Sequence, residues 1–150
     1  STRVRSSAAS DVYKRQDYVV LYKFHPLLGD IQCNGGVNMN KEDLYTLMQV
    51  SDCLISDYSS VIFDYSLLNK PMISYIPDVK EYKHNIGLNI DFDDFPGPVC
   101  TDEDQLVKAL EFKDYDYDKL SYFQIKYMVY TDGKNTSRVI DTINQIMEEV

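Results

Sequence analysis

A polar corner between a strand-type segment and a helix-type segment constrains the fold of this chain more than any other feature. Cys53–Ser56 is a short apolar run typical of a strand, and the corner Asp57–Ser60 follows it. Apolar residues then recur at helical spacing, at Val61, Ile62, Tyr65 and Leu68. The first backbone N–H groups of a helix lack intrahelical partners and carry partial positive charge. The sequence therefore predicts an anion site at this corner, where Ser59 and Ser60 add donors for a phosphorylated ligand.

Strand-type and helix-type segments alternate along the rest of the chain. Strands are expected at Tyr18–Phe24, Cys53–Ser56 and Pro71–Ile76, with intervening helices at Lys41–Val50 and Ser59–Leu68. Further helices are expected at Asp78–His84, from Thr101 onward with Thr101 as its N-cap, at Asp118–Tyr130 and at Ser137–Val150. This order predicts a three-layer, Rossmann-like α/β fold with a parallel sheet and a ligand at the carboxyl ends of the strands.

Two predicted strand ends carry polar residues. His25-Pro26 ends the first strand, because proline cannot continue the ladder of hydrogen bonds, and Asp57–Ser60 follows the second. In one parallel sheet these two ends should meet on the same rim. Leu27–Gly36 is interpreted as a loop, and Asn40 as the N-cap of the next helix. Three strands make a small sheet, so we expect at least one more in the sequence upstream.

The composition is that of one soluble globular domain. The 150 residues are 44% hydrophobic and 26% charged, and no apolar run approaches the length that spans a bilayer. The formal charge of −9 argues against nucleic acid or an anionic membrane as a partner of the surface at large. Scattered cysteines without a CxxC pair indicate buried thiols: Cys33, Cys53 and Cys100. No metal or cofactor is predicted, because a group of carboxylates lacks the spacing of a calcium loop: Asp91, Asp93 and Asp94.

Residues 1–16 are set apart from the fold. They show no hydrophobic period, and residues 6–16 can be reverse-translated into a widely used sequencing-library adapter. We therefore interpret residues 1–16 as a disordered cloning or assembly artefact, and residues 17–150 as a natural domain truncated at its N-terminus. A natural disordered tail is the alternative.

Several motifs of the chain recur in the order of a known family. They are Lys-Phe-His-Pro from Lys23, Leu-Ile-Ser-Asp-Tyr-Ser-Ser-Val-Ile-Phe-Asp from Leu54, Leu-Leu-Asn-Lys-Pro from Leu67, Pro-Gly-Pro from Pro96 and Asp-Gly-Lys from Asp132. From about Tyr18 to Ile146 the chain resembles the C-terminal half of the CDP-glycerol glycerophosphotransferases, the teichoic acid polymerase and primase type. The resemblance implies the donor-binding lobe of a two-lobed, GT-B type transferase.

The resemblance also implies an activity. Such an enzyme transfers glycerol phosphate from CDP-glycerol to a polyol-phosphate (teichoic acid) acceptor and releases CMP. This chain would bind the donor, would depend on another lobe for the acceptor, and would be inactive alone. The implied location is the bacterial cytoplasm, peripheral at the inner face of the membrane through segments outside this chain. A CDP-ribitol or nucleotide-sugar donor is one alternative, and a non-catalytic α/β module such as a response regulator is another.

The resemblance assigns roles to individual residues. Ser59 and Ser60 match a serine pair on the donor phosphates, although one serine at this place is also a common helix cap. His25 matches a histidine that stabilises charge on the departing CMP, and it is the catalytic candidate. Lys23 and Phe24 precede it in the donor-binding motif. Lys23 stands where the family usually has arginine, and it lacks the two-pronged grip of arginine on phosphate.

Other polar and aromatic residues have competing interpretations. Asp64 is assigned to ribose or glycerol hydroxyls, or to orienting Lys23, and the alternative is a favourable charge near a helix N-terminus. Asp57 is interpreted as a turn residue rather than a base. A tyrosine stripe at near-helical spacing is interpreted as helix packing rather than a nucleic-acid platform: Tyr115, Tyr117, Tyr122, Tyr127 and Tyr130.

Overall fold

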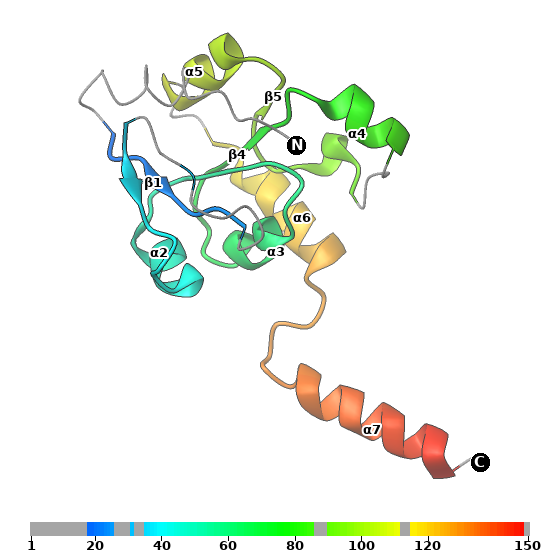
Figure 1. The fold of residues 1–150 in the computed structure, drawn as a ribbon. Coiled ribbons are helices and arrows are strands. Elements are labelled where there is room, and N and C mark those ends of the chain that lie inside the picture. Colours follow the sequence, from blue (N-terminus) through cyan, green and yellow to red (C-terminus); the bar gives the residue numbers. More distant parts are fainter. Residues whose placement is uncertain (1–17, 26–30, 32–34, 86–89, 112–114, 149–150) are drawn as a thin grey trace.

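The computed structural model describes residues 18–25, 31, 35–85, 90–111 and 115–148. The part from β1 to α6 is here called the body, and α7 extends away from it (Figure 1). The strands are β1 (Leu21–Tyr22), β2 (Val37–Asn38), β3 (Leu54–Ser56), β4 (Met72–Tyr75) and β5 (Val99–Cys100). The helices are α2 (Leu44–Val50), α3 (Val61–Ser66), α4 (Val79–Asn85), the 3-10 helix η2 (Phe92–Asp94), α5 (Glu103–Glu111), α6 (Tyr117–Tyr127) and α7 (Asn135–Glu148). The segment interpreted as an artefact, residues 1–16, lies outside the described residues, as do Pro26 and Cys33.

The central sheet consists of three parallel strands in the order β3-β4-β5. Ser56 of β3 lies opposite Ser74 of β4, and Ser74 lies opposite Val99 of β5. The predicted strands at Cys53–Ser56 and Pro71–Ile76 and the parallel direction of the sheet are confirmed. The sequence does not predict β5, because two residues between a proline and a helix are too short to show a strand period.

The first predicted strand is shorter than expected and pairs with a different partner. Of the expected Tyr18–Phe24, only Leu21–Tyr22 forms a strand, and it pairs in parallel with β2. The prediction of one sheet that includes this strand is wrong, since the described strands form two separate sheets. The cause is local, because the chain after the predicted loop turns back onto β1. The backbone N–H of Val37 donates to the carbonyl oxygen of Val20 at 2.8 Å.

Helices cover both faces of the central sheet, which confirms the predicted three-layer α/β fold. On one face Met72 of β4 packs with residues of α3 and α6, including Tyr65 and Phe123. On the other face Ile73 packs with Leu106 of α5. Neighbouring residues of a strand point to opposite faces, so Met72 and Ile73 divide β4 between the two clusters. Figure 1 shows α5 on one side of the strands and α3 with α6 on the other.

Two helices begin at aspartate caps that the sequence pattern did not single out. Asp43, rather than the expected Asn40, caps α2 with its side chain. At the start of α5, Asp102 Oδ1 accepts the backbone N–H of Gln105 at 2.8 Å, so the cap is not the expected Thr101. The Asn40 side chain accepts a hydrogen bond from the end of β1 and the Thr101 hydroxyl donates to Gln105 Oε1, which explains both corrections.

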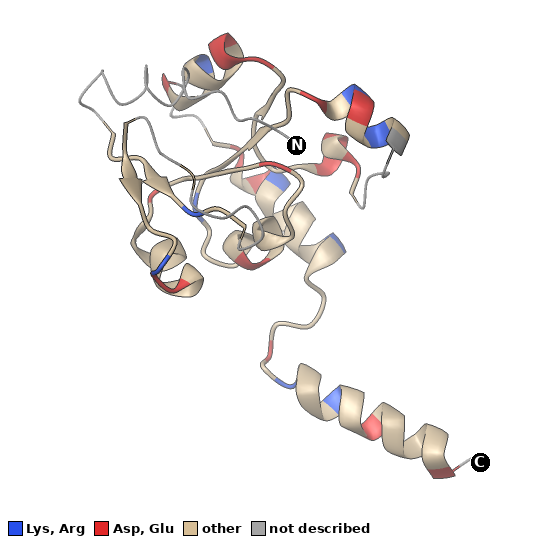
Figure 2. Cartoon of the chain, viewed as in Figure 1, with Lys and Arg blue, Asp and Glu red and all other residues tan. Residues whose placement is uncertain are grey.

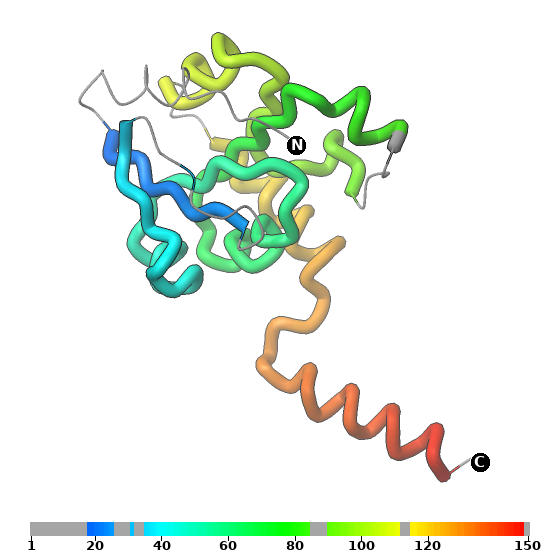
Figure 3. Tube along the Cα trace, in the orientation of Figure 1, coloured from blue at the N-terminus to red at the C-terminus, as the bar shows by residue number. Residues whose placement is uncertain are grey.

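Helix α7 contains no buried residue, and every residue of it except Arg138 is exposed. It begins two residues before the predicted start at Ser137, and the tube in Figure 3 shows it leading away from the body. Its apolar residues are exposed: Val139, Ile140, Ile143, Ile146 and Met147. Among the residues that the structure describes, no helix combines the length and apolar character needed to cross a membrane.

Candidate functional site

Short-range hydrogen bonds shape the corner between β3 and α3. Asp57 Oδ1 accepts the backbone N–H of Ser59 at 3.1 Å, and Ser59 Oγ accepts the backbone N–H of Val61 at 3.4 Å. Asp57 is therefore the turn residue that the sequence predicts, and Ser59 has the local capping contact expected of one serine. Helix α3 begins at Val61, two residues later than predicted.

Ser60 has a different environment from Ser59. It occupies the N-cap position of α3, but its side chain makes no capping hydrogen bond. Both serines are exposed to solvent. Because α3 has only 6 residues, its dipole is small, and the serine hydroxyls are the stronger feature of this corner for an anion. Contact of Ser59 and Ser60 with a donor phosphate stays a prediction.

The end of β1 is held by Asn40, which lies between β2 and α2. Asn40 Oδ1 accepts the backbone N–H of Phe24 at 2.8 Å. Lys23 Nζ donates to the carbonyl oxygens of Asn40 at 2.8 Å and of Glu42 at 2.7 Å. The ring of Phe24 stacks on that of Tyr22, with centroids 5.6 Å apart. Sequence reasoning missed this role of Asn40, because a polar residue ahead of a helical pattern looks the same whether it caps the helix or fastens a strand.

The contacts of Lys23 bear on the role expected for Asp64. Asp64 lies in the first turn of α3 and is exposed. The interpretation in which Asp64 orients Lys23 has no support, because two backbone carbonyls already orient the ammonium group of Lys23. A contact of Asp64 with ribose or glycerol hydroxyls stays a prediction.

His25 follows Phe24 and is exposed. Since β1 and β3 belong to separate sheets, hydrogen bonding between strands does not bring His25 to Asp57–Ser60 in the way that the sequence suggested. Their convergence on one ligand stays a prediction.

An aromatic cluster next to the corner has no counterpart in the sequence interpretation. The ring of Tyr58 stacks on that of Tyr82 in α4, with centroids 3.6 Å apart and planes at 11°. The hydroxyl of Tyr58 donates to Asp78 Oδ1 at 2.9 Å. Burial, with the hydrogen bond to Asp78 as a second cause, raises the pKa of Tyr58 well above its usual range, so its hydroxyl stays protonated. These residues are far apart in the sequence, and no spacing pattern links them.

The comparison with known families decides what this corner belongs to. The family described as CDP-glycerol:poly(glycerophosphate) glycerophosphotransferase matches residues 8–145. The chain belongs to this family. The match begins inside the segment interpreted as an artefact, and the assignment of residues 1–16 stays a prediction.

The curated relatives of this glycerophosphotransferase-family chain are named as enzymes of teichoic acid synthesis. It is 36% identical over 145 residues to the teichoic acid ribitol-phosphate primase of Bacillus spizizenii, and the matched region is 88% of this chain and 36% of the primase. It is 30% identical over 139 residues to the teichoic acid glycerol-phosphate primase of Bacillus subtilis, and the matched region is 89% of this chain and 36% of that primase. The chain therefore spans about a third of the length of these relatives.

Solved structures of the wall teichoic acid polymerase TagF share the fold. One matches 99% of this chain and 40% of the TagF chain with a TM-score of 0.72 and 28% identity. Another, a histidine-to-asparagine variant soaked with CDPG, matches 99% of this chain and 39% of its own with a TM-score of 0.75 and 28% identity. The predicted family, its transferase class and the GT-B type fold are thus confirmed.

The other side chains of this glycerophosphotransferase-family chain that could act as a nucleophile or bind a metal do not form a second site in the part that the structure describes. Burial raises the pKa of the Cys53 thiol to about 11, so it is not a thiolate nucleophile at neutral pH. Asp94 Oδ2 accepts from Lys126 Nζ at 2.6 Å and from the Tyr127 hydroxyl at 2.8 Å. Within the described ranges, no three His, Cys, Asp or Glu side chains gather as a metal site would require. Figure 2 shows Lys and Arg distributed over several elements of the described chain.

Proposed function

We propose that this chain forms the nucleotide-donor lobe of a transferase that moves glycerol phosphate from CDP-glycerol to a polyol-phosphate, teichoic acid acceptor. The observation that carries this proposal is the match of 99% of the chain to a TagF structure soaked with CDPG. The family description, which names glycerophosphate transfer, supports the same reaction. The acceptor would be held by a further part of a longer protein, as the covered share of the relatives suggests.

The proposed chemistry is a displacement at phosphorus. A hydroxyl of the acceptor attacks the β-phosphorus of CDP-glycerol, the bond from that phosphorus to the oxygen bridging to CMP breaks, and CMP leaves with the electron pair. The exposed hydroxyls of Ser59 and Ser60 would donate to the phosphate oxygens, where negative charge increases in the transition state. His25, if it reaches the same phosphates, would stabilise the charge on CMP or protonate it. The general base would come from outside this chain.

Lys23 and its neighbours have a more indirect part in this proposal. Two N–H groups of the Lys23 ammonium are used by Asn40 and Glu42, which leaves one of its three donors for a phosphate. Lys23 and Phe24 therefore contribute chiefly by holding the segment that leads to His25. Asp64 would accept hydrogen bonds from ribose or glycerol hydroxyls, because a carboxylate next to a diphosphate would be repelled by it.

A ribitol donor is the second candidate, and a specific observation favours it. The ribitol-phosphate primase is 36% identical to this chain, compared with 30% for the glycerol-phosphate primase. CDP-ribitol carries the same CMP group and diphosphate, so the corner at Ser59 and Ser60 would serve both donors. For either donor we propose a cytoplasmic enzyme that is peripheral at the inner face of the membrane, as the resemblance to the family implies.

Titration calorimetry with the purified 150-residue chain tests the donor assignment. CDP-glycerol, CDP-ribitol and a UDP-sugar are compared, and we expect weak binding of the CDP compounds, roughly millimolar, with no product formed. Replacing both Ser59 and Ser60 by alanine should abolish the binding, since two hydrogen bonds to a charged group are lost. Binding that is unchanged in this double variant, or tighter binding of the UDP-sugar, would overturn the proposal.

A further inference from the structure

Tyr58 is the half-buried residue of an otherwise exposed corner. Asp57, Ser59 and Ser60 on either side of it face solvent. The Tyr58 ring lies between two other segments of the chain. It stacks on Tyr82 of α4 at 3.6 Å, and it meets the edge of Phe92 of η2 at 6.1 Å, with the planes at 78°. The edge-to-face contact with Phe92 is an arrangement that aromatic pairs favour. Three separate segments are therefore joined at this one side chain.

The hydroxyl of Tyr58 adds a polar connection between neighbouring strand ends. It donates to Asp78 Oδ1 at 2.9 Å, and Asp78 follows β4 just as Tyr58 follows β3. The carbonyl oxygen of Asp78 also accepts the backbone N–H of Tyr82 at 3.0 Å, so the same residue begins α4. A hydrogen bond to a charged acceptor is among the stronger ones in proteins. The carboxyl ends of β3 and β4 are therefore cross-linked by one side chain.

This cross-link acts on the backbone that carries the two serines. Tyr58 is adjacent to Ser59, whose N–H is already held by Asp57 and whose hydroxyl accepts from Val61. The Ser60 side chain makes no capping bond. With the backbone fixed on both sides, two hydroxyls can be presented to a ligand without first ordering the corner, and such preorganisation strengthens binding.

We propose that Tyr58 is a positioning residue for the donor site, which acts through Ser59 and Ser60 by its stack on Tyr82 and its hydrogen bond to Asp78. The inference rests on the proposed function, since it assumes that the two serines bind the donor diphosphate. It assigns Tyr58 no contact with the donor itself.

The test removes only the hydroxyl. Tyr58→Phe keeps the ring stack but loses the bond to Asp78, and we expect the dissociation constant for CDP-glycerol to rise about fivefold. The matched control is Tyr127→Phe in α6, which removes a tyrosine–carboxylate bond of the same kind, from Tyr127 to Asp94 at 2.8 Å. The control variant should bind CDP-glycerol as the unchanged chain does.

A double-mutant cycle separates positioning from a general loss of stability. If Tyr58 acts through the serines, Tyr58→Phe should have less effect on CDP-glycerol binding in a Ser60→Ala background than in the unchanged chain. Equal effects in both backgrounds, or unchanged binding in Tyr58→Phe, would overturn the positioning role while the donor site stands. If the unchanged chain fails to bind CDP-glycerol at millimolar concentrations, the donor site falls, and the inference falls with it.

Discussion

The body and α7 are held in place by different kinds of interaction. In the body, side chains such as Tyr65, Phe95 and Phe123 are fully buried, and apolar clusters lie on both faces of the central sheet. In α7 no residue is buried. Burial of apolar surface is the dominant favourable term in folding, so the body should carry nearly all of the stability of the chain. The position of α7 must depend on something else.

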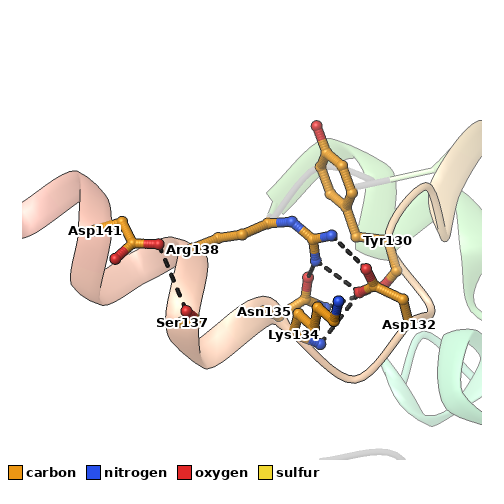
Figure 4. A network of polar contacts seen from close by, with 7 residues as sticks. All are labelled: Tyr130, Asp132, Lys134, Asn135, Ser137, Arg138 and Asp141. Carbon is orange, nitrogen blue, oxygen red and sulfur yellow. Dashed lines mark hydrogen bonds and ion pairs between the residues drawn. The ribbon is translucent and has the colours of Figure 1, made fainter.

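Polar contacts between the loop before α7 and the first turn of α7 hold this helix in place. Asp132 and Arg138 form a two-pronged pair, with Nη1 2.8 Å from Oδ1 and Nη2 2.6 Å from Oδ2 (Figure 4). The guanidinium group also lies over the ring of Tyr130, 4.5 Å from its centroid, and Asn135 donates to the Tyr130 carbonyl oxygen at 3.0 Å. We call Tyr130–Arg138 the elbow. Exposed pairs of this kind contribute little to global stability, but a two-pronged geometry sets a direction.

The largest loss in the free energy of unfolding should come from removing a large side chain from the core of the body. Phe123 of α6 is fully buried, its ring stacks on that of Phe63, and the ring of Tyr127 lies tilted against it. Phe123→Ala should lower the free energy of unfolding by about 3–5 kcal/mol, measured by chemical denaturation. The control is Ile125→Ala, two residues along the same helix and 76% exposed, which should change it by less than about 0.5 kcal/mol. Similar losses in the two variants would contradict the view that buried apolar side chains stabilise the body.

A second test compares glycines in the two regions. A Cβ at Gly97 would lie 1.8 Å from the carbonyl oxygen of Met72 in β4, whereas a Cβ at Gly133 in the elbow meets nothing within 4 Å. Gly97→Ala must push the chain away from the sheet, so we expect a loss of at least about 2 kcal/mol in global unfolding.

Gly133→Ala is the control for this comparison. Its φ of +73° is unfavourable for alanine by roughly 1–2 kcal/mol, but this strain falls on the elbow. It should loosen the start of α7 without lowering the unfolding midpoint of the body. A larger effect at Gly133 than at Gly97 would show that the elbow and the body unfold together.

The difference between the regions also explains how much of the fold could be read from the sequence. The strand at Pro71–Ile76 and the helices around Ile62 and Leu106 bury regular apolar patterns, and these patterns predict them correctly. β2 and β5 have two residues each, and their pairing depends on where the chain turns back in space. A hydrophobic period cannot show which strands pair, and for this reason the partner predicted for β1 was wrong.

In the candidate site, the contacts between near neighbours in the sequence could also be predicted, and the contacts between distant residues could not. Asp57 and Ser59 make contacts within two residues of themselves, so local turn chemistry predicts them. The contacts of Lys23 with Asn40 and of Tyr58 with Asp78 join residues 17 and 20 positions apart. Such contacts are set by the tertiary fold, and a family motif names the residues without showing which of them touch.

Acidification should loosen the elbow only at a pH near 2. The pairing with Arg138 lowers the pKa of Asp132 from 3.8 to about 2. A lowered carboxyl pKa means that the pairing is fully present above pH 3.8 and is lost as the pH falls through about 2. The NMR shift of the Asp132 carboxyl against pH should show this midpoint, and in an Arg138→Gln variant it should return to the ordinary range. A midpoint near 3.8 in the unchanged chain would mean that the elbow is not closed in solution.

The smallest effect is expected from removing α7 itself. Without residues 131–150, the thermal unfolding midpoint of the body should stay within about 2 °C of that of the full chain, because α7 buries none of its residues. A 14-residue helix without tertiary packing is marginal in water, so the backbone amides of α7 should exchange with solvent much faster than those of α6. A clear fall in the midpoint on truncation, together with slow exchange in α7, would mean that its apolar residues pack on the body in solution. The two regions would then share one core, and the elbow would be part of it.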